Sequence, residues 1–275
     1  RLMRCPIVAV TGTNGKTTTV SMIEKVLQES GKKAEACGNV GSPMIKHLNL
    51  TAEDVAVAEI SSFQLETLNS LCPHIAVVLN VTEDHLNRHY NMENYIFLKK
   101  KILKNATETE YAVLNYDDEI VKKFEDATRA KRIYFSLRER VDGAYIKDEA
   151  IYYFDEKIME IKDLLLIGKH NVQNALATVC VAKLLGVETQ VIARALGEFK
   201  GIKHRIERVG VIDGVEYIDD SKATNVDATL KAVGAIKSEI VLLVGGKDKG
   251  YDYDKLFISL RNSSVVKSIL YGENR

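Results

Sequence analysis

The sequence predicts an α/β fold. A mostly parallel sheet of the phosphate-loop type is flanked by helices, carries a small antiparallel sheet, and is followed by a partial Rossmann-like α/β domain. Apolar runs of strand length at residues 7–10, 54–60 and 75–81 alternate with helical stretches, and they suit central parallel strands covered on both faces. Short, closely spaced β-rich runs between residues 132 and 161 indicate the antiparallel sheet.

Composition sets outer limits on function. The 275 residues are enough for one large domain or two, and Lys+Arg and Asp+Glu both number 38. A formal net charge of zero gives no bulk attraction to nucleic acid or to an anionic membrane, so neither is an expected partner. No apolar run approaches the roughly 20 residues that a membrane span needs, and the N-terminus lacks a signal-peptide core.

The four cysteines predict a reducing compartment. They are widely separated, with no Cys-x-x-Cys pair, and are Cys5, Cys37, Cys72 and Cys180. This pattern is typical of reduced structural thiols in a cytoplasmic protein, and it favours neither a disulfide framework nor a zinc site.

The first glycine-rich turn carries the strongest functional signal. Two glycines let the backbone bend and aim its N–H groups at an anion, and the helix that follows adds its positive end. Lys16 can reach phosphate oxygens, and the Thr17 hydroxyl is placed to bind Mg²⁺. The predicted phosphate-binding residues are Gly12, Thr13, Asn14, Gly15, Lys16, Thr17 and Thr18.

The turn is shorter than the usual phosphate loop. Only Thr13 and Asn14 separate the glycines, and Val10 stands where the outer glycine would be. An ordinary strand-to-helix turn is therefore the alternative. The apolar strand before the turn and the amphipathic helix after it favour phosphate binding.

Polar side chains at two further turns are candidates for the same site. Glu59 ends the strand at residues 54–60, and ligands of open α/β sheets bind outside the carboxyl ends of strands. A carboxylate there is costly to bury unless it is paired or bound to metal, so Glu59 is a candidate Mg²⁺ ligand, or simply a strand end that reaches water. Asn39, between Gly38 and Gly41, could contact substrate or belong to a plain turn.

The segment after the third strand contains two histidines. His85 and His89 are four residues apart and would share a helix face, but Leu86 replaces the glutamate of the zincin pattern. The pattern therefore does not favour a zinc protease. Asp84 or His85 fits a magnesium or substrate site, and His89 is expected at the surface. The neighbouring lysines Lys100, Lys101 and Lys104 are expected on a solvated face.

A second domain is predicted to begin after residue 201. Residues 1–201 would form the first domain and residues 202–275 the second, which opens with a hairpin at residues 206–218 and ends after two or three strands, as an incomplete domain. Before the boundary, Asn171 and Asn174 share the first turn of a helix, where they could cap it or hold a nucleotide's base or ribose.

Several stretches resemble the Mur ligase family. The shortened phosphate loop Thr11-Gly12-Thr13-Asn14-Gly15-Lys16-Thr17 is similar to that family's loop. Glu59-Ile60-Ser61-Ser62-Phe63-Gln64-Leu65-Glu66 and Asp220-Ser221-Lys222-Ala223-Thr224-Asn225 resemble its D-glutamate-adding members. Residues 80–85, 168–174 and 204–205 agree in order and spacing, so the resemblance covers essentially the whole chain.

The resemblance implies a reaction. ATP would phosphorylate the terminal carboxylate of UDP-N-acetylmuramoyl-L-alanine, and the D-glutamate amine would displace phosphate from the acyl phosphate, forming an amide in peptidoglycan precursor synthesis. It implies catalytic roles for Lys16, Glu59, His85 and Lys99, with Thr17 and Glu59 at a first Mg²⁺ and His85 and a CO₂-carbamylated Lys99 at a second. It implies nucleotide contacts by Asn171, Asn174, Arg205 and Asp220, and substrate contacts by Asn39, Ser61, Lys222, Thr224 and Lys249.

The resemblance also sets limits. The family's UDP-binding domain and the end of its C-terminal domain have no counterpart in these residues, so we expect a cytoplasmic, monomeric chain that binds ATP but ligates weakly or not at all. Another Mur-type or folylpolyglutamate-type ligase is an alternative. A kinase, a generic ATPase or a non-catalytic nucleotide-binding module would explain Lys16 and Thr17 but not residues 221–225.

Overall fold

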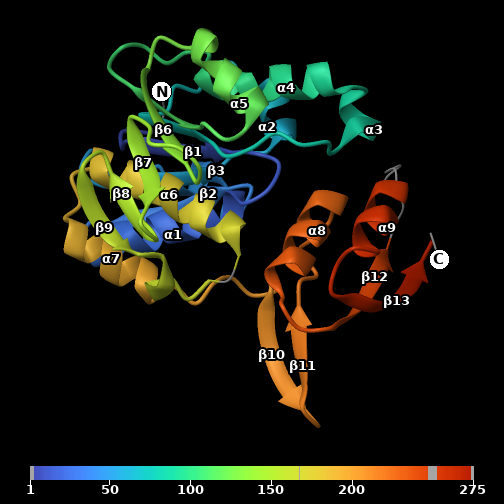
Figure 1. Ribbon diagram of the computed structural model, residues 1–275. Helices are drawn as coiled ribbons and strands as arrows, with labels where there is room; N and C mark the ends of the chain where they lie inside the picture. The colour runs from blue at the N-terminus through green and yellow to red at the C-terminus, as the bar shows by residue number, and fades with distance from the viewer. Residues whose placement is uncertain (1–2, 167, 247–252, 274–275) are drawn as a thin grey trace. The chain divides into compact units, whose positions relative to one another are not determined.

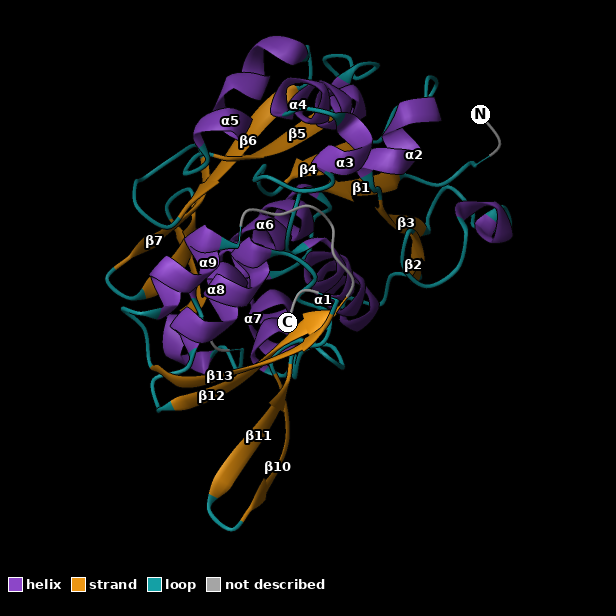
Figure 2. Cartoon of the chain, turned by 90° about the vertical axis from the view of Figure 1, so that its right-hand side faces the viewer, coloured by secondary structure: helices purple, strands orange, loops and turns teal. Residues whose placement is uncertain are grey.

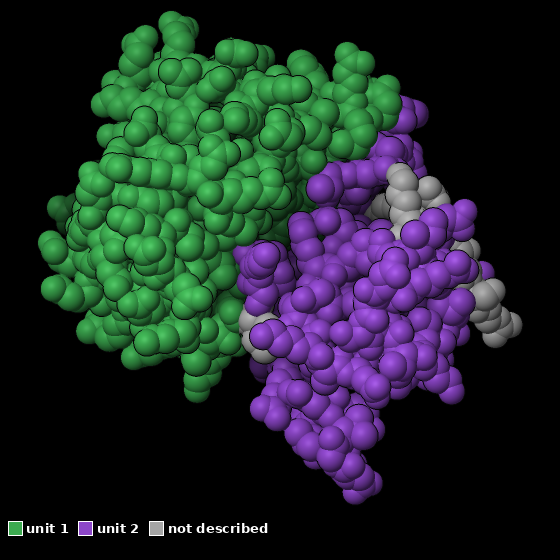
Figure 3. Space-filling model, viewed as in Figure 1, with its two compact units in different colours: residues 1–81, 91–166, 171–200 green, residues 82–90, 167–170, 201–275 purple. Residues whose placement is uncertain are grey.

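The computed structural model describes residues 3–166, 168–246 and 253–273 and consists of two compact units (Figure 3). Unit 1 takes residues 1–81, 91–166 and 171–200, and unit 2 takes residues 82–90, 167–170 and 201–275. The last division along the chain thus falls between Lys200 and Gly201.

Unit 1 is built on a single nine-stranded sheet with the strand order β2-β3-β1-β4-β5-β6-β7-β8-β9. Its strands are β1 (Ile7–Thr11), β2 (Ala34–Gly38), β3 (Val55–Glu59), β4 (Ile75–Val78), β5 (Tyr111–Asn115), β6 (Lys131–Ser136), β7 (Gly143–Lys147), β8 (Ala150–Tyr153) and β9 (Glu156–Glu160). Neighbours from β2 to β7 pair in parallel, and β8 pairs antiparallel with both β7 and β9.

Helices cover both faces of this sheet (Figures 1 and 2). One face carries α2 (Ser62–Thr67), α4 (Met92–Lys100) and α5 (Glu119–Lys122), and the other carries α1 (Lys16–Glu29), α6 (Lys169–Leu184) and α7 (Thr189–Gly197). Short 3₁₀ turns, η1 (Met44–His47), η2 (Lys101–Leu103), η3 (Lys123–Ala127) and η4 (Ile161–Asp163), complete the connections. Because both faces are covered, every residue of β1, β3 and β4 is buried, which explains their unbroken apolar runs.

The predicted fold class is confirmed, with two differences in detail. The sequence did not predict β2, in which only Ala34 and Cys37 are buried. The runs in β6 and β7, expected in the antiparallel sheet, pair in parallel with each other. The two strands pair only from Tyr134 to Ser136 in β6. The loop of residues 137–142 therefore only has to run back along three residues before β7 begins, and no crossover helix is needed.

Unit 2 contains two small sheets. β10 (Glu207–Ile212) and β11 (Val215–Asp219) form the predicted hairpin, and β12 (Ile240–Gly246) pairs in parallel with β13 (Val265–Gly272). Its helices are α3 (Leu86–His89), α8 (Val226–Ala235) and α9 (Asp254–Leu260), and its core is the small cluster of Val233, Leu256 and Leu260. Over the described residues, every helix falls short of the length and apolar character that crossing a bilayer requires.

Candidate functional site

The turn between β1 and α1 has a shape that requires glycine at its last position. Gly15 is the N-cap of α1 with φ 87°, and a Cβ there would lie 2.4 Å from the Asn174 side-chain oxygen. Gly15 also has no side chain to cap the helix. The first amides of α1, which have no partner within the helix, can therefore receive an anion.

Two lysine amines line this turn. Lys16 Nζ donates to the carbonyl oxygens of Gly12 and Thr13 at 2.9 Å each, and Lys99 Nζ donates to the Gly12 oxygen at 2.8 Å. Lys99 comes from α4 and is only 1 % exposed, whereas Lys104 is exposed. The Tyr95 ring centroid lies 4.6 Å from Lys99 Nζ, and the Tyr95 hydroxyl bonds the Thr13 hydroxyl at 3.2 Å. Two positive charges therefore lie against the backbone of the turn, at Gly12 and Thr13.

Glu59 places a carboxylate at the first turn of α1. Its side chain, at the end of β3, is 3 % exposed, and it accepts hydrogen bonds from Thr17 Oγ1 and Asn39 Nδ2, both at 2.8 Å. The structure thereby brings together three residues from separate turns that the sequence predicted one by one. A carboxylate and a hydroxyl next to a helix N-terminus are the hard oxygen donors that Mg²⁺ prefers, so these residues fit a magnesium ion beside phosphates.

Asn80 is a residue of this site that sequence reasoning did not single out. Its side chain accepts from the Asn14 amide at 2.8 Å and donates to the Asn14 carbonyl at 3.0 Å, while its own carbonyl accepts from the Thr13 amide at 2.9 Å. Asn80 follows β4, so the strand-end argument that identified Glu59 could have found it.

The two asparagines of α6 lie together, as their spacing predicts. Asn174 Nδ2 donates to Asn171 Oδ1 at 3.3 Å, and Thr19 Oγ1 in α1 donates to Asn174 Oδ1 at 3.3 Å. Asn174 therefore ties α6 to the first turn of α1. Ser61, by contrast, is the N-cap of α2 and forms a capping box with Gln64, which is a structural role.

A second group of predicted residues belongs to unit 2. His85 has φ 54° and begins α3, with its Nε2 atom 3.6 Å from Asp84 Oδ2, and Asn225 Nδ2 donates to that oxygen at 3.0 Å. The expectation that His89 lies at the surface is wrong, because it is 3 % exposed. The four-residue spacing places its ring beside that of His85, with centroids 6.4 Å apart.

Two of the remaining unit 2 candidates, Arg205 and Asp220, lie near the start of the hairpin. Two non-glycine residues in the left-handed region, His204 (φ 69°) and Ile206 (φ 46°), flank Arg205. Asp220 Oδ1 accepts from the Ile206 amide at 3.1 Å, and burial raises the pKa of the Asp220 carboxyl above its usual value. Among the other candidates, Lys222 and Thr224 are exposed, and Lys249 lies outside the described residues.

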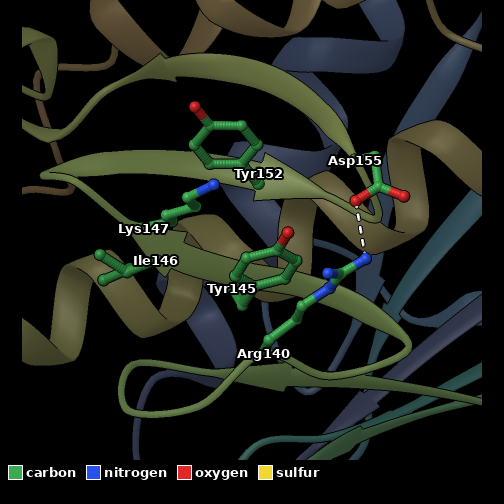
Figure 4. A pocket seen from close by; sticks show the side chains of 6 residues that line it. All are labelled: Arg140, Tyr145, Ile146, Lys147, Tyr152 and Asp155. Atoms are coloured by element: carbon green, nitrogen blue, oxygen red, sulfur yellow. Dashed lines mark hydrogen bonds and ion pairs between the residues drawn. The ribbon is translucent and has the colours of Figure 1, made fainter.

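A hollow of about 300 Å³ lies on β7 and β8, and none of the residues described above lines it (Figure 4). Tyr145 and Tyr152 stack in it with ring centroids 5.9 Å apart, and Arg140 pairs with Asp155 at 2.7 Å across its rim. None of its lining residues belongs to a motif that the sequence singled out.

Comparison with known proteins identifies close relatives of known name. The family model described as the Mur ligase middle domain matches residues 10–182. UDP-N-acetylmuramoylalanine–D-glutamate ligase of Thermoanaerobacter sp. (strain X514) is 45 % identical over 279 aligned positions, which cover 99 % of this chain and 61 % of that protein. The enzyme of the same name from Streptococcus equi subsp. zooepidemicus is 43 % identical over 271 positions, covering 98 % and 60 %. The chain thus spans about three fifths of the length of these relatives.

Solved structures share the fold at low sequence identity. MurF from Acinetobacter baumannii has a TM-score of 0.81 at 21 % identity, covering 98 % of this chain and 64 % of that one. MurF ligase from Thermotoga maritima, solved in complex with ADP, has a TM-score of 0.77 at 19 % identity, covering 98 % and 71 %. At these identities the likeness concerns the fold alone.

Proposed function

The chain belongs to the Mur ligase family, and we propose that it is the ATP-binding and catalytic part of a UDP-N-acetylmuramoylalanine–D-glutamate ligase. Residues 1–201 would be the ATP-binding domain and residues 202–275 part of the C-terminal domain. The whole ligase would perform ADP-forming amide synthesis on small-molecule substrates, in the cytoplasm and as a monomer, and this chain would bind ATP but ligate weakly or not at all. The names of the relatives and the geometry of the phosphate loop support this proposal.

One observation carries it. The buried carboxylate of Glu59 is held between the Thr17 hydroxyl and the Asn39 amide, next to the N-terminus of α1, where Thr17 lies. A carboxylate in that place repels phosphate unless a cation lies between them. Its retention beside an anion-binding turn therefore points to a metal–triphosphate ligand and not to a bare anion.

The chain's own residues suggest how transfer would be assisted. The α1 amides would hold the ATP phosphates, and Lys16 would exchange its bonds to Gly12 and Thr13 for bonds to phosphate oxygens. Thr17 and Glu59 would hold Mg²⁺, which supplies charge neutralisation and orients the γ-phosphoryl group. An oxygen of the L-alanine carboxylate would attack that phosphorus as ADP leaves. The D-glutamate amine would then attack the acyl carbon, expel phosphate and lose a proton.

Other roles rest on the resemblance. His85 and a carbamylated Lys99 would serve a second Mg²⁺, and the carbamate would turn a buried cation into a carboxylate-like ligand. The proposed nucleotide contacts are Asn171, Asn174, Arg205 and Asp220, and the proposed substrate contacts are Asn39, Ser61, Lys222, Thr224 and Lys249.

The test is phosphate release by the chain with Mg·ATP, UDP-N-acetylmuramoyl-L-alanine and D-glutamate, each omitted in turn, together with Mg·ATP binding. Release that requires all three substrates supports the ligase. Lys16→Ala should abolish ATP binding, whereas the matched variant Lys104→Ala, at an exposed lysine, should leave it unchanged. Absence of ATP binding by the unaltered chain would overturn the proposal, and D-glutamate-independent release would favour a generic ATPase.

A further inference from the structure

Side chains of β2, of η1 and of the loop that joins them form a hydrogen-bonded relay that the proposed function does not use. The Ser42 hydroxyl bonds His47 Nε2, and His47 Nδ1 lies 2.6 Å from Glu35 Oε2. The His47 side chain is nearly buried, whereas Glu35 is half-buried, with its other oxygen 4.0 Å from Lys33 Nζ. Both ring nitrogens of His47 are therefore engaged.

The partners fix the direction of the bonds. An ionised carboxylate can only accept, so His47 Nδ1 carries the proton and donates it to Glu35. In the neutral imidazole, His47 Nε2 accepts from the Ser42 hydroxyl, in the order found in serine-nucleophile triads. The residue after the serine is Pro43, however, and it lacks the N–H that stabilises an oxyanion at nucleophile turns. The relay is therefore better suited to holding Ser42 in place than to activating it.

Ser42 closes the turn that carries Asn39. Its carbonyl accepts from the Gly38 amide at 3.0 Å, and it forms an isolated bridge with Cys37. Within this closed turn, the Asn39 amide N–H donates to the Glu59 carbonyl at 2.9 Å, and the Asn39 side chain holds the Glu59 carboxylate. A Cβ at Gly38 would lie 2.4 Å from the Glu59 carbonyl oxygen, so the turn is packed directly onto the end of β3. The relay thus acts on Glu59 through Asn39.

We propose that His47, with Ser42 and Glu35, is a positioning residue that holds the Asn39 amide on Glu59 and so raises the affinity of the phosphate site for Mg²⁺. The inference rests on the proposed function, because it assumes that Glu59 serves a metal–ATP site. Removing a residue that orients a metal-binding carboxylate commonly lowers metal affinity tenfold or more. His47 is one step further from the carboxylate than Asn39, so its removal should lower the affinity less.

The experiment measures ATP binding by the full chain across a Mg²⁺ titration. His47→Leu and Ser42→Ala should each raise the Mg²⁺ concentration at half-saturation roughly three- to tenfold, on the order of the loss of one hydrogen bond. His47→Gln, whose amide can both donate and accept, should restore most of the affinity. Lys46→Ala changes an exposed neighbour in η1 and is the matched control, so its Mg²⁺ concentration at half-saturation should equal that of the unaltered chain.

A variant cycle separates positioning from general damage to the fold. If His47 acts through Asn39, His47→Leu should not raise the Mg²⁺ concentration at half-saturation any further in a chain that already carries Asn39→Ala. If His47→Leu damages the fold independently, its effect on that concentration should be the same with and without Asn39→Ala. If His47→Leu and Ser42→Ala both bind ATP with the Mg²⁺ dependence of the unaltered chain, His47 has no positioning role, and the proposed function is unaffected. Loss of ATP binding in the unaltered chain would instead remove the proposed function. Labelling of Ser42 by a fluorophosphonate, lost in His47→Leu, would reveal a nucleophile and also overturn the positioning role.

Discussion

The strands of unit 1 and of unit 2 use apolar residues in opposite ways. All of β3 is buried between two helix layers, whereas β12 and β13 expose Leu243 (66 %) and Val266 (61 %). The hairpin β10–β11 likewise exposes Val209 and Ile212. Unit 1 therefore has a large continuous core, and unit 2 has a small one beneath α8 and α9.

This difference indicates where the free energy of unfolding is concentrated. Apolar area removed from water contributes about 25 cal/mol per Å², and local opening is easiest where few apolar contacts are buried. The phosphate loop and Glu59 lie on the well-buried unit, while Arg205 and Asp220 lie on the other. The predicted nucleotide contacts therefore differ in how firmly their own elements are held.

The same substitution in the two units should give very different results. Leu114→Ala, at a fully buried position in β5, should lower the free energy of unfolding by about 2–5 kcal/mol because it opens a cavity. Leu243→Ala, in exposed β12, should change it by less than about 0.5 kcal/mol. Urea denaturation followed by circular dichroism measures both. Equal losses would contradict the contrast between the units.

Two glycines with similar backbone conformations provide a second matched pair. Gly15 has φ 87° and packs against Asn174, whereas Gly214, at the hairpin turn, has φ 78° and open space around its Cα. Gly214→Ala should cost only the left-handed strain of about 1–2 kcal/mol, and Gly15→Ala should cost more and also weaken ATP binding. Thermal unfolding and ATP titration give the two readouts. Equal losses of stability in the two variants would show that the Asn174 side chain can move to accommodate a Cβ at residue 15.

Acidification should weaken unit 2 through His170. Burial, with a further contribution from Lys231, lowers the pKa of His170 to about 4. As the pH falls below the ordinary value of 6.5, His170 binds a proton in the unfolded chain before it does so in the folded chain. The contribution of His170 to the free energy of unfolding is therefore fully present above about pH 6.5 and is lost as the pH falls from 6.5 to about 4. Denaturation midpoints at pH 7 and pH 5 test this, and His170→Gln should remove its share of the change. An unchanged pH dependence in that variant would exclude His170 as its source.

The smallest effect is expected on the surface of the hairpin. Arg208 pairs with Glu216 at 2.6 Å, but the side chains are 69 % and 43 % exposed. Arg208→Ala should therefore change the free energy of unfolding by about 0–1 kcal/mol, and less at high salt. A larger loss would mean that ion pairs compensate for the thin apolar core of unit 2.

The sequence predicted the parts of the fold that burial dictates. β1, β3 and β4 were identified because residues buried on both faces must be apolar without interruption. β2 was missed because three of its five positions are only half-buried, which leaves neither an apolar run nor strict alternation. The parallel pairing of β6 and β7 could not be predicted either, since strand pairing depends on contacts that local patterns do not record.

The candidate site was predictable where chemistry and position coincide. Gly15, Lys16 and Glu59 combine a diagnostic residue type with a strand end or helix start. The burial of Lys99 could not be predicted from a run of three lysines, and only the resemblance distinguished this lysine from its neighbours. The bonding of His47 to Ser42 and Glu35 follows no regular spacing, because it depends on how an irregular loop folds back on its strand.

The paired bonds between Asn14 and Asn80 have a kinetic consequence. They fix the outer part of the phosphate loop to the end of β4, so the loop has little conformational entropy left to lose when a ligand arrives. Nucleotide association should therefore follow a single exponential whose rate rises linearly with concentration, without a slow isomerisation. Removing the side-chain tether in Asn80→Ala should introduce a second phase whose rate reaches a plateau, visible by stopped flow with a fluorescent ATP analogue.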